Sequence, residues 1–528
     1  MITNNYNQAV QQPINILPEH LKQNDFVQKR WRYLDALKSG IVSKCENYAE
    51  WTIPSVFPYA GDNENTEMTL DYQSLGAEAV NNMANKLALT LLTPHRPFFR
   101  LNLTVEERSA LSETGMTTPQ INSALSQAEK DSMAELERIG VRTGTVDAAK
   151  LILVTGNALL KIPEDSDTQA QAFNLRRYCY RRDQSGNPVE IVLRQVADLS
   201  TFDENIRKRI IATRDGADKD NSEVELFTYM ALIKNRWELV QAAEAVTLAD
   251  SHSVYKKDAL PYIPLVWNRV DDETYGRGLV EDYAGDFHGY HGLSSAGANL
   301  TAIACDIKFI ADPKAGNDID TLNNSETGTY VAGMPDTIGT STSALTLPTE
   351  LLEMYLNKYE RRIGRAFLLN SSMVRDAERV TAEEIRFISD ELQTAHGSVY
   401  ANLSNTFQTQ LATLLLKRIK FDVIKSKPTI VTGLDSLARS TEINNLRLWL
   451  QDMALLDQVP ESLQAILKKD DIAAAFGAGY GITHTDYIMS AKEQQEAQSA
   501  ALDNELASNA AQSVGQSMGQ PAASGPVG

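Results

Sequence analysis

The strongest constraint on the fold of this chain is one long apolar stripe that ends near Arg418. Apolar residues recur there at steps of three and four, the spacing that brings side chains onto one face of an α-helix. The members of the stripe are Ile385, Ile388, Leu392, Ala395, Val399, Leu403, Phe407, Leu411 and Leu414. An unbroken helix from Thr381 to Arg418 would be roughly 55 Å long at about 1.5 Å per residue. We therefore predict a helix that crosses between layers of a larger structure, with a kink at Gly397.

The start of this helix carries a capping box. The hydroxyl of Thr381 can accept a hydrogen bond from the backbone N–H of Glu384, whose carboxylate can reach back to the N–H of Thr381. Other carboxylates gather around the same point, and attraction to the helix dipole explains them without a catalytic role. The residues before the box, from Leu368 to Arg379, form a charged connector that packing periodicity does not explain.

Net charge limits what the surface can bind. The chain has 528 residues, enough for two to four domains, and its 50 basic and 69 acidic residues give a net charge of −19. A surface this acidic cannot bind nucleic acid over its whole extent, because tight binding needs cations that neutralise the phosphates. Local basic patches, or a repulsive wall that faces nucleic acid, remain compatible with this charge.

Cysteine usage and hydropathy indicate the compartment. Cys45, Cys179 and Cys305 are odd in number and lack metal-binding spacing, so we expect free thiols in a reducing environment. No apolar run approaches the ~18 residues that cross a bilayer. The segment Met1–Pro13 is polar, unlike a secretory signal. We expect a soluble intracellular protein with no membrane partner.

The predicted elements change character along the chain, with helical stripes in the first and last thirds and strand patterns in the middle. Predicted helices cover residues 21–48, 71–92, 118–138, 146–160, 278–309, 351–367, 441–456 and 460–467. Two hairpins are predicted, one at 176–195 around the turn residues Asp183–Asn187 and one at 224–241. The fold class is α+β, predominantly helical. Residues 493–528 have the composition of a disordered tail.

The helix predicted at residues 21–48 carries many cations opposite its apolar face. They are Lys22, Lys29, Arg30, Arg32, Lys38 and Lys44. Such a run forms either the solvated face of a packed helix or a contact for an acidic partner.

Glycines are concentrated in the helix predicted at residues 278–309. They are Gly285, Gly289, Gly292 and Gly297. Each costs a helix about 1 kcal/mol relative to alanine. Their presence indicates that neighbouring helix backbones approach closely along this helix.

The motifs of common enzymes are missing. No Gly-x-x-x-x-Gly-Lys-Ser/Thr loop occurs, so the chain is not the ATPase of a nucleic-acid motor. Gly276 and Gly278 lack the third glycine and the preceding strand of a dinucleotide site. His288 and His291 lie one helical turn apart, which allows either a metal site or ordinary ring packing. We expect no catalytic residue, no cofactor and no metal; a metal-dependent hydrolase is the alternative.

Four segments resemble the portal, or head-to-tail connector, proteins of short-tailed bacteriophages (podoviruses). They are Ser74–Ala77 through Phe98–Leu101, Tyr275–Gly278 with the helix that follows, Met373–Ile385 and Val431–Leu437. Their order and spacing match that family across nearly the whole chain. The resemblance implies a homo-oligomeric ring, normally of twelve copies, at one vertex of the capsid in the virion. Double-stranded DNA would pass through the channel of this ring during packaging and ejection.

The resemblance also implies partners and regions. The partners are the terminase large subunit, the tail adaptor protein, and the major capsid and scaffolding proteins, with assembly in the cytoplasm of the bacterial host. The regions are an N-terminal helical wing part (1–162), a strand-rich wing and clip region (163–274), a stem helix (275–310), a wing return with a channel loop (311–380), the long helix and crown (381–492) and the tail (493–528).

Within the channel loop, Arg375 and Arg379 would form rings of positive charge that contact DNA phosphates without reading sequence. The alternative is a surface loop whose charges are merely solvated. For the whole chain, a structural ring or adaptor that conducts no DNA also remains open.

Overall fold

The computed structural model of the chain separates into two compact units, Met1–Gly433 and Leu434–Gly528. The structure describes residues 25–62, 65–66, 72–94, 97–103, 118–165, 168–214, 221–271, 273–305, 308–311, 320, 324, 338–341, 346–369, 382–421, 429–432, 439–456, 472–473, 475–476 and 479. Within them, no helix is both long and apolar enough to span a membrane.

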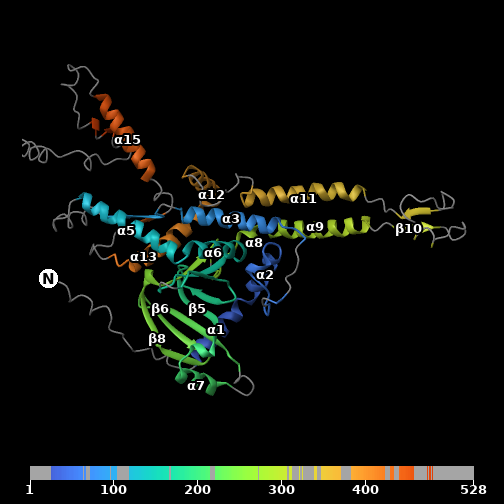
Figure 1. The fold of residues 1–528 in the computed structure, drawn as a ribbon, viewed down its shortest axis with the longest axis horizontal. Coiled ribbons are helices and arrows are strands. Elements are labelled where there is room, and N and C mark those ends of the chain that lie inside the picture. The colour runs from blue at the N-terminus through green and yellow to red at the C-terminus, as the bar shows by residue number, and fades with distance from the viewer. Residues whose placement is uncertain are drawn as a thin grey trace, which may run out of the picture. The chain divides into compact units, whose positions relative to one another are not determined.

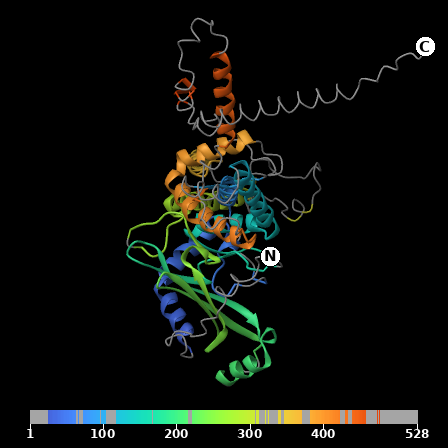
Figure 2. The ribbon, with the colours of Figure 1, turned by 90° about the vertical axis from the view of Figure 1, so that its left-hand side faces the viewer.

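A five-stranded antiparallel sheet forms one part of the first unit (Figures 1 and 2). Its strands are β4 (Tyr178–Arg182), β5 (Pro188–Asp198), β6 (Glu223–Ile233), β7 (Arg236–Ala243) and β8 (Val246–Lys256), and each pairs with the next in sequence. Both predicted hairpins are confirmed, β4–β5 and β6–β7. In the first turn the backbone N–H of Asp183 donates to the carbonyl of Asn187. Helix α7 (Glu204–Thr213) contacts β8 at one end of the sheet.

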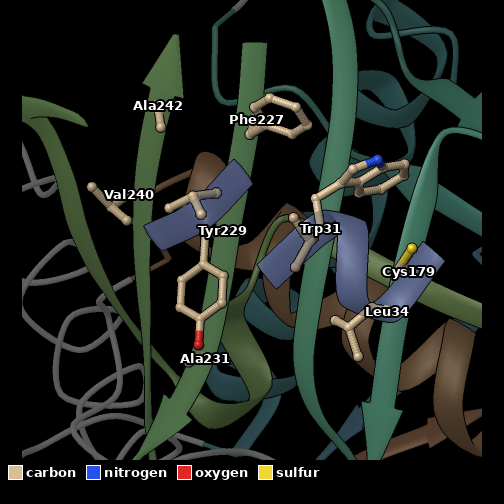
Figure 3. Packing of buried hydrophobic residues seen from close by; sticks show 10 residues of the cluster. Trp31, Leu34, Cys179, Phe227, Tyr229, Ala231, Val240 and Ala242 are labelled. Atoms are coloured by element: carbon tan, nitrogen blue, oxygen red, sulfur yellow. The ribbon is translucent and has the colours of Figure 1, made fainter. Parts of the chain in front are cut away.

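One face of this sheet is covered by helix α1 (Phe26–Leu37) (Figure 3). Trp31 and Leu34 point from the helix onto the strands, where they pack in one cluster with Phe227 and Cys179. The rings of Trp31 and Phe227 lie 6.0 Å apart between centroids. Helix spacing on one side and strand alternation on the other therefore build one closed apolar core.

The helix predicted at residues 21–48 is wrong in one respect, because the structure divides it into α1 and α2 (Ser39–Glu50). The break falls at Lys38, whose side chain is buried. Its ammonium donates to the carbonyl oxygens of Leu175 at 2.7 Å and Tyr178 at 2.9 Å. Lys38 is thus an internal cation and not part of a solvated basic face.

A second layer combines helices with a three-stranded antiparallel sheet. The helices are α3 (Leu75–Leu91), α5 (Thr118–Arg138) and α6 (Val141–Thr155); the sheet has the order β3 (Gln171–Phe173), β2 (Asn157–Lys161), β9 (Tyr262–Val266). A separate pair joins β1 (Phe99–Asn102) to β12 (Thr429–Thr432).

The helix predicted at residues 146–160 is wrong at its end. It stops at Thr155 because Gly156 takes a left-handed φ of 77°, and the chain continues as β2.

A helical hairpin follows the strand-rich region. Helix α8 (Leu279–Asp282) leads into α9 (Ala284–Cys305), which lies beside α11 (Thr346–Ala366) (Figure 1). Between them β10 (Lys308–Ala311) pairs with β11 (Ile338–Ser341). The helix predicted to reach about Phe309 therefore ends earlier, and Phe309 belongs to a strand paired with distant residues.

The long apolar stripe forms one helical run of three parts. They are α12 (Ala382–Leu403), a π-helical turn (Ser404–Gln408) and α13 (Thr409–Arg418). The predicted kink is confirmed and lies one residue earlier, at His396, where φ is −136° and ψ is 38°. The His396 ring contacts the carbonyl oxygen of Ala366 at 3.2 Å, which gives this side chain a partner outside its own helix.

Short 3-10 turns occur at Pro54–Val56, Leu199–Thr201 and Lys257–Ala259.

In the second unit, α15 (Arg439–Leu456) confirms the helix predicted at 441–456. Its Trp449 is buried and donates from Nε1 to the carbonyl of Ala473 at 3.2 Å. The helix predicted at 460–467 and the tail at 493–528 lie outside the described residues.

Candidate functional site at the helical hairpin

The base of the hairpin is a tight backbone junction. Gly276 and Gly278, just before α8, lie against Gly156 at the end of α6. A Cβ on Gly156 would collide with the carbonyl oxygen of Gly276, and one on Gly278 would lie 2.6 Å from the carbonyl oxygen of Leu153. Close backbone approach is therefore a sufficient reason for glycine at Gly276 and Gly278.

Asn157 joins the two sides of this junction. Its side chain is fully buried, and its Nδ2 donates to the carbonyl of Gly276 at 2.8 Å. Its Oδ1 accepts from the backbone N–H of Gly276 at 2.8 Å and from the hydroxyl of Tyr180 at 3.1 Å. One amide side chain thus serves as a backbone partner and fixes where the hairpin leaves the body. No pattern in the sequence marks Asn157 as part of this junction.

Two of the four glycines in α9 face α11. A Cβ on Gly289 would lie 2.9 Å from the Tyr359 ring, and one on Gly297 would lie 2.8 Å from Leu352. Arg362 of α11 also bonds Asp286 of α9 at 2.9 Å. Close helix approach occurs here within one chain.

The other two glycines, Gly285 and Gly292, meet open space among the described residues. Within the part of the chain that the structure describes, no atom lies within 4 Å of a Cβ built on either one. The helix propensity that each sacrifices is therefore not explained by packing inside one copy.

The outer side of α11 exposes a stripe of large apolar residues. Leu351, Met354 and Tyr355 are 52%, 55% and 45% exposed and stand at i, i+3 and i+4. Exposed cations continue along the same helix toward its C-terminal end: Lys358, Arg361 and Arg365. A contiguous apolar stripe of this kind is typical of an interaction surface.

Only the first two residues of the connector Leu368–Arg379 are described, Leu368 and Leu369. Helix α12 begins after it, at Ala382. Arg375, Arg379 and Thr381 lie outside the described residues. The backbone of Glu384 lies in the first turn of α12, and its side chain is not described.

The two histidines considered as metal ligands contact aromatic rings. His288 lies 5.2 Å from Trp51 and His291 lies 6.4 Å from Tyr72, measured between ring centroids. Among the described residues, no group of three or more His, Cys, Asp or Glu side chains is placed to hold a metal ion.

A hollow of about 600 Å³ lies between α1, α2 and the segment before α8. On its rim Arg30 donates to Glu190 through two hydrogen bonds of 2.7 and 2.6 Å, and Arg181 adds a third. Burial opposes ionisation of Glu190, but the two guanidinium groups hold its pKa below the usual range. The Cys45 thiol also lines this hollow and forms no disulfide. Burial raises its pKa to about 12. A buried thiol and paired charges favour a structural role for the residues that line this hollow.

Comparison with known proteins gives the family. Residues 24–488 match the family described as bacteriophage head to tail connecting protein. The portal protein of Enterobacteria phage SP6 is 32% identical over 86% of this chain and 88% of its own length. The portal protein of Enterobacteria phage T3 is 31% identical over 89% and 90%, and that of Escherichia phage T7 is 29% identical over 91% and 92%. The chain belongs to the bacteriophage head-to-tail connecting proteins.

Solved structures show weaker likeness. A chain from the virion of a native gene transfer agent particle aligns with a TM-score of 0.36 at 13% identity, over 78% of this chain and 90% of its own. A chain from the neck of an empty gene transfer agent particle aligns with a TM-score of 0.36 at 12% identity, over 82% and 94%. The family assignment rests on the sequence relatives.

Proposed function

We propose that this chain is a phage portal subunit that forms a ring of twelve copies at one capsid vertex. Double-stranded DNA enters and leaves the capsid through this ring. The observation that carries the proposal is the family match over residues 24–488. It is joined by two portal proteins that align with this chain over 88% and 90% of their own lengths. The terminase large subunit and then the tail adaptor dock on the ring, which assembles in the host cytoplasm with the major capsid and scaffolding proteins.

The hairpin supplies a physical reason for a ring. Its apolar stripe on α11 and its open glycines on α9 lie on surfaces that one copy leaves uncovered. These surfaces differ from each other, so a contact between them is head-to-tail, and such contacts close into a ring when the rotation permits. We assign the hairpin to the stem and expect α9 of one copy to meet α11 of the next.

Net charge suits a conduit that does not hold DNA tightly. Twelve copies at −19 each carry about −230, a field that repels phosphates within about 10 Å of the surface. Local cations are then needed to steady the DNA, and we assign Arg375 and Arg379 of the connector to that task. Their contacts would be independent of sequence and weakened by salt.

Electron microscopy and sedimentation of the purified protein test the ring. A hollow ring of uniform copy number is expected at micromolar concentration. Monomers and dimers alone would contradict the proposal.

Replacement of Arg375 and Arg379 by alanine tests the conduit and separates it from a structural ring or adaptor that conducts no DNA. Rings and procapsids should form in normal numbers, while DNA packaging or retention falls. A double variant that packages and retains a full genome at wild-type efficiency would show that these arginines are solvated.

A further inference from the structure

The C-terminal end of α11 is unusual in its backbone. The N–H of Leu369 donates to the carbonyl of Gly364 at 2.8 Å, and the N–H of Leu368 points to the carbonyl of Arg365 at 3.4 Å. This hydrogen-bond pattern is the Schellman motif, which normally places glycine at its left-handed position. Here the position is held by Leu368, with φ of 55°. A bulky side chain disfavours this conformation, so the surroundings must stabilise it.

Side chains from two other helices hold the carbonyls of this turn. Asn82 of α3 donates from Nδ2 to Phe367 at 3.1 Å and to Leu368 at 3.2 Å. Lys86, one turn further along α3, donates from Nζ to Leu368 at 2.7 Å. His396, at the kink of α12, contacts the carbonyl of Ala366 at 3.2 Å. Three neighbouring carbonyls at the end of α11 are therefore fixed from outside their own helix.

Lys86 also reaches the helix that follows the connector. Its Nζ lies 3.6 Å from Oε2 of Glu391 in α12, and its side chain is 0% exposed. Burial lowers the pKa of Lys86, and the charge of Glu391 opposes that shift. A buried ammonium is costly unless it is paired. Its three donors can serve partners in different directions, which suits a group that joins two elements.

The end of α13 provides a comparison inside the same chain. There the N–H of Phe421 donates to Leu416 at 3.1 Å and that of Lys420 donates to Lys417 at 3.2 Å, and Lys420 has φ of 52°. The turn is the same, but Lys420 is exposed to solvent. The same turn therefore also forms where its left-handed residue is exposed to solvent. The burial of Lys86 at the end of α11 calls for another reason.

We propose that Lys86 is a positioning residue for the connector between α11 and α12. It fixes, at one ammonium group on α3, both the point where the chain leaves α11 and the helix to which it returns. Asn82 and His396 hold the neighbouring carbonyls of Phe367 and Ala366. The consequence for DNA passage rests on the portal function proposed above, since the connector carries Arg375 and Arg379.

Lys86→Met tests this assignment, because it keeps most of the length of the unbranched side chain and removes the ammonium. Lys420→Met is the matched control, the same change at the exposed turn. Two measurements are made on assembled rings: hydrogen exchange of peptides that cover residues 363–369, and genome packaging when the variant replaces the portal protein in an infected cell. For Lys86→Met we expect rings, at least tenfold faster exchange in that segment and at least tenfold less packaged DNA. The control should match wild type in both.

A second variant separates positioning from stability. Lys86→Met with Glu391→Gln removes both charges of the pair and should recover thermal stability lost in the single variant, because no carboxylate is left unpaired. Packaging and slow exchange should not recover. Recovery of packaging together with stability, or wild-type exchange and packaging in Lys86→Met, would overturn the proposal.

Asn82→Leu keeps Lys86 and covers the case in which Lys86→Met does not fold. It should speed exchange in the same segment, and unchanged exchange would count against the proposal. If the wild-type chain itself fails to form rings or to package DNA, the portal function is wrong. The exchange measurements still test the link between α3, α11 and α12.

Discussion

The sheet and the helical hairpin solve the same problem of burying apolar side chains in opposite ways. In the sheet, α1 closes one face, and Trp31 is only 3% exposed. In the hairpin, α9 and α11 cover each other on one side and leave Leu351, Met354 and Tyr355 about half exposed. The apolar core of the sheet is covered within one chain. The apolar stripe of the hairpin is covered only when another surface packs on it, which is the behaviour expected of a subunit in an assembly.

The largest effect should come from opening the sheet core. Trp31→Ala removes the side chain that packs on Phe227 and should lower the free energy of unfolding by about 3–5 kcal/mol. Leu37→Ala on the same helix is the control, since Leu37 is 66% exposed and its loss should cost less than about 0.5 kcal/mol. Denaturant unfolding measures both. Equal losses would show that the core does not close on α1.

The next effect tests the charges at the edge of this core. Glu190→Gln weakens the pairing with Arg30 and Arg181 and should cost about 2 kcal/mol at neutral pH. The folded protein holds the pKa of Glu190 below its unfolded value. Its contribution is therefore present above the unfolded pKa and is lost as pH falls through the folded pKa. Unfolding free energy measured from pH 7 to pH 3 should fall less steeply in the variant; parallel curves would contradict this.

The tight backbone junction at the base of the hairpin should be sensitive to a single methyl group. Gly156→Ala should cost more than about 1 kcal/mol, because φ is 77° and the new Cβ meets the carbonyl of Gly276. Gly61→Ala shares the positive φ of 96° but has open space, so it isolates the backbone strain. Thermal unfolding should rank Gly156→Ala clearly below Gly61→Ala. Similar values would mean that the junction can yield.

Within the hairpin, a glycine of α9 that packs against α11 and one that meets open space should respond differently. Gly289→Leu forces the Tyr359 ring to move and should weaken the hairpin and splay the ring of subunits. Gly292→Leu enters open space and should leave the monomer as stable as wild type or up to about 1 kcal/mol more stable, through helix propensity. Sedimentation should nevertheless show fewer rings for Gly292→Leu. Normal rings with both variants would remove the hairpin from the subunit contact.

The smallest effect should follow removal of Ala497–Gly528. This segment has few apolar residues to bury, so neither the melting temperature nor ring formation should change. A large drop in melting temperature on truncation would contradict the composition argument.

Local patterns in the sequence determined the elements whose causes are local. The turn Asp183–Asn187 predicted the first hairpin, and spacing of three and four predicted the helical run that ends at Arg418. The kink near Gly397 was also visible, since glycine weakens a helix wherever it stands. The four segments that resemble portal proteins were enough to predict the family, which the match over residues 24–488 confirms.

Tertiary structure decided what depends on a partner far away in the chain. Lys38 breaks a helix because the carbonyls that take its ammonium belong to Leu175 and Tyr178. Residues 157–160 leave a helical pattern because β9, a hundred residues later, offers a strand to pair with. The four glycines of α9 look alike in sequence, yet two meet α11 and two meet open space. Periodicity gives the faces of an element, but only the folded chain determines what covers each face.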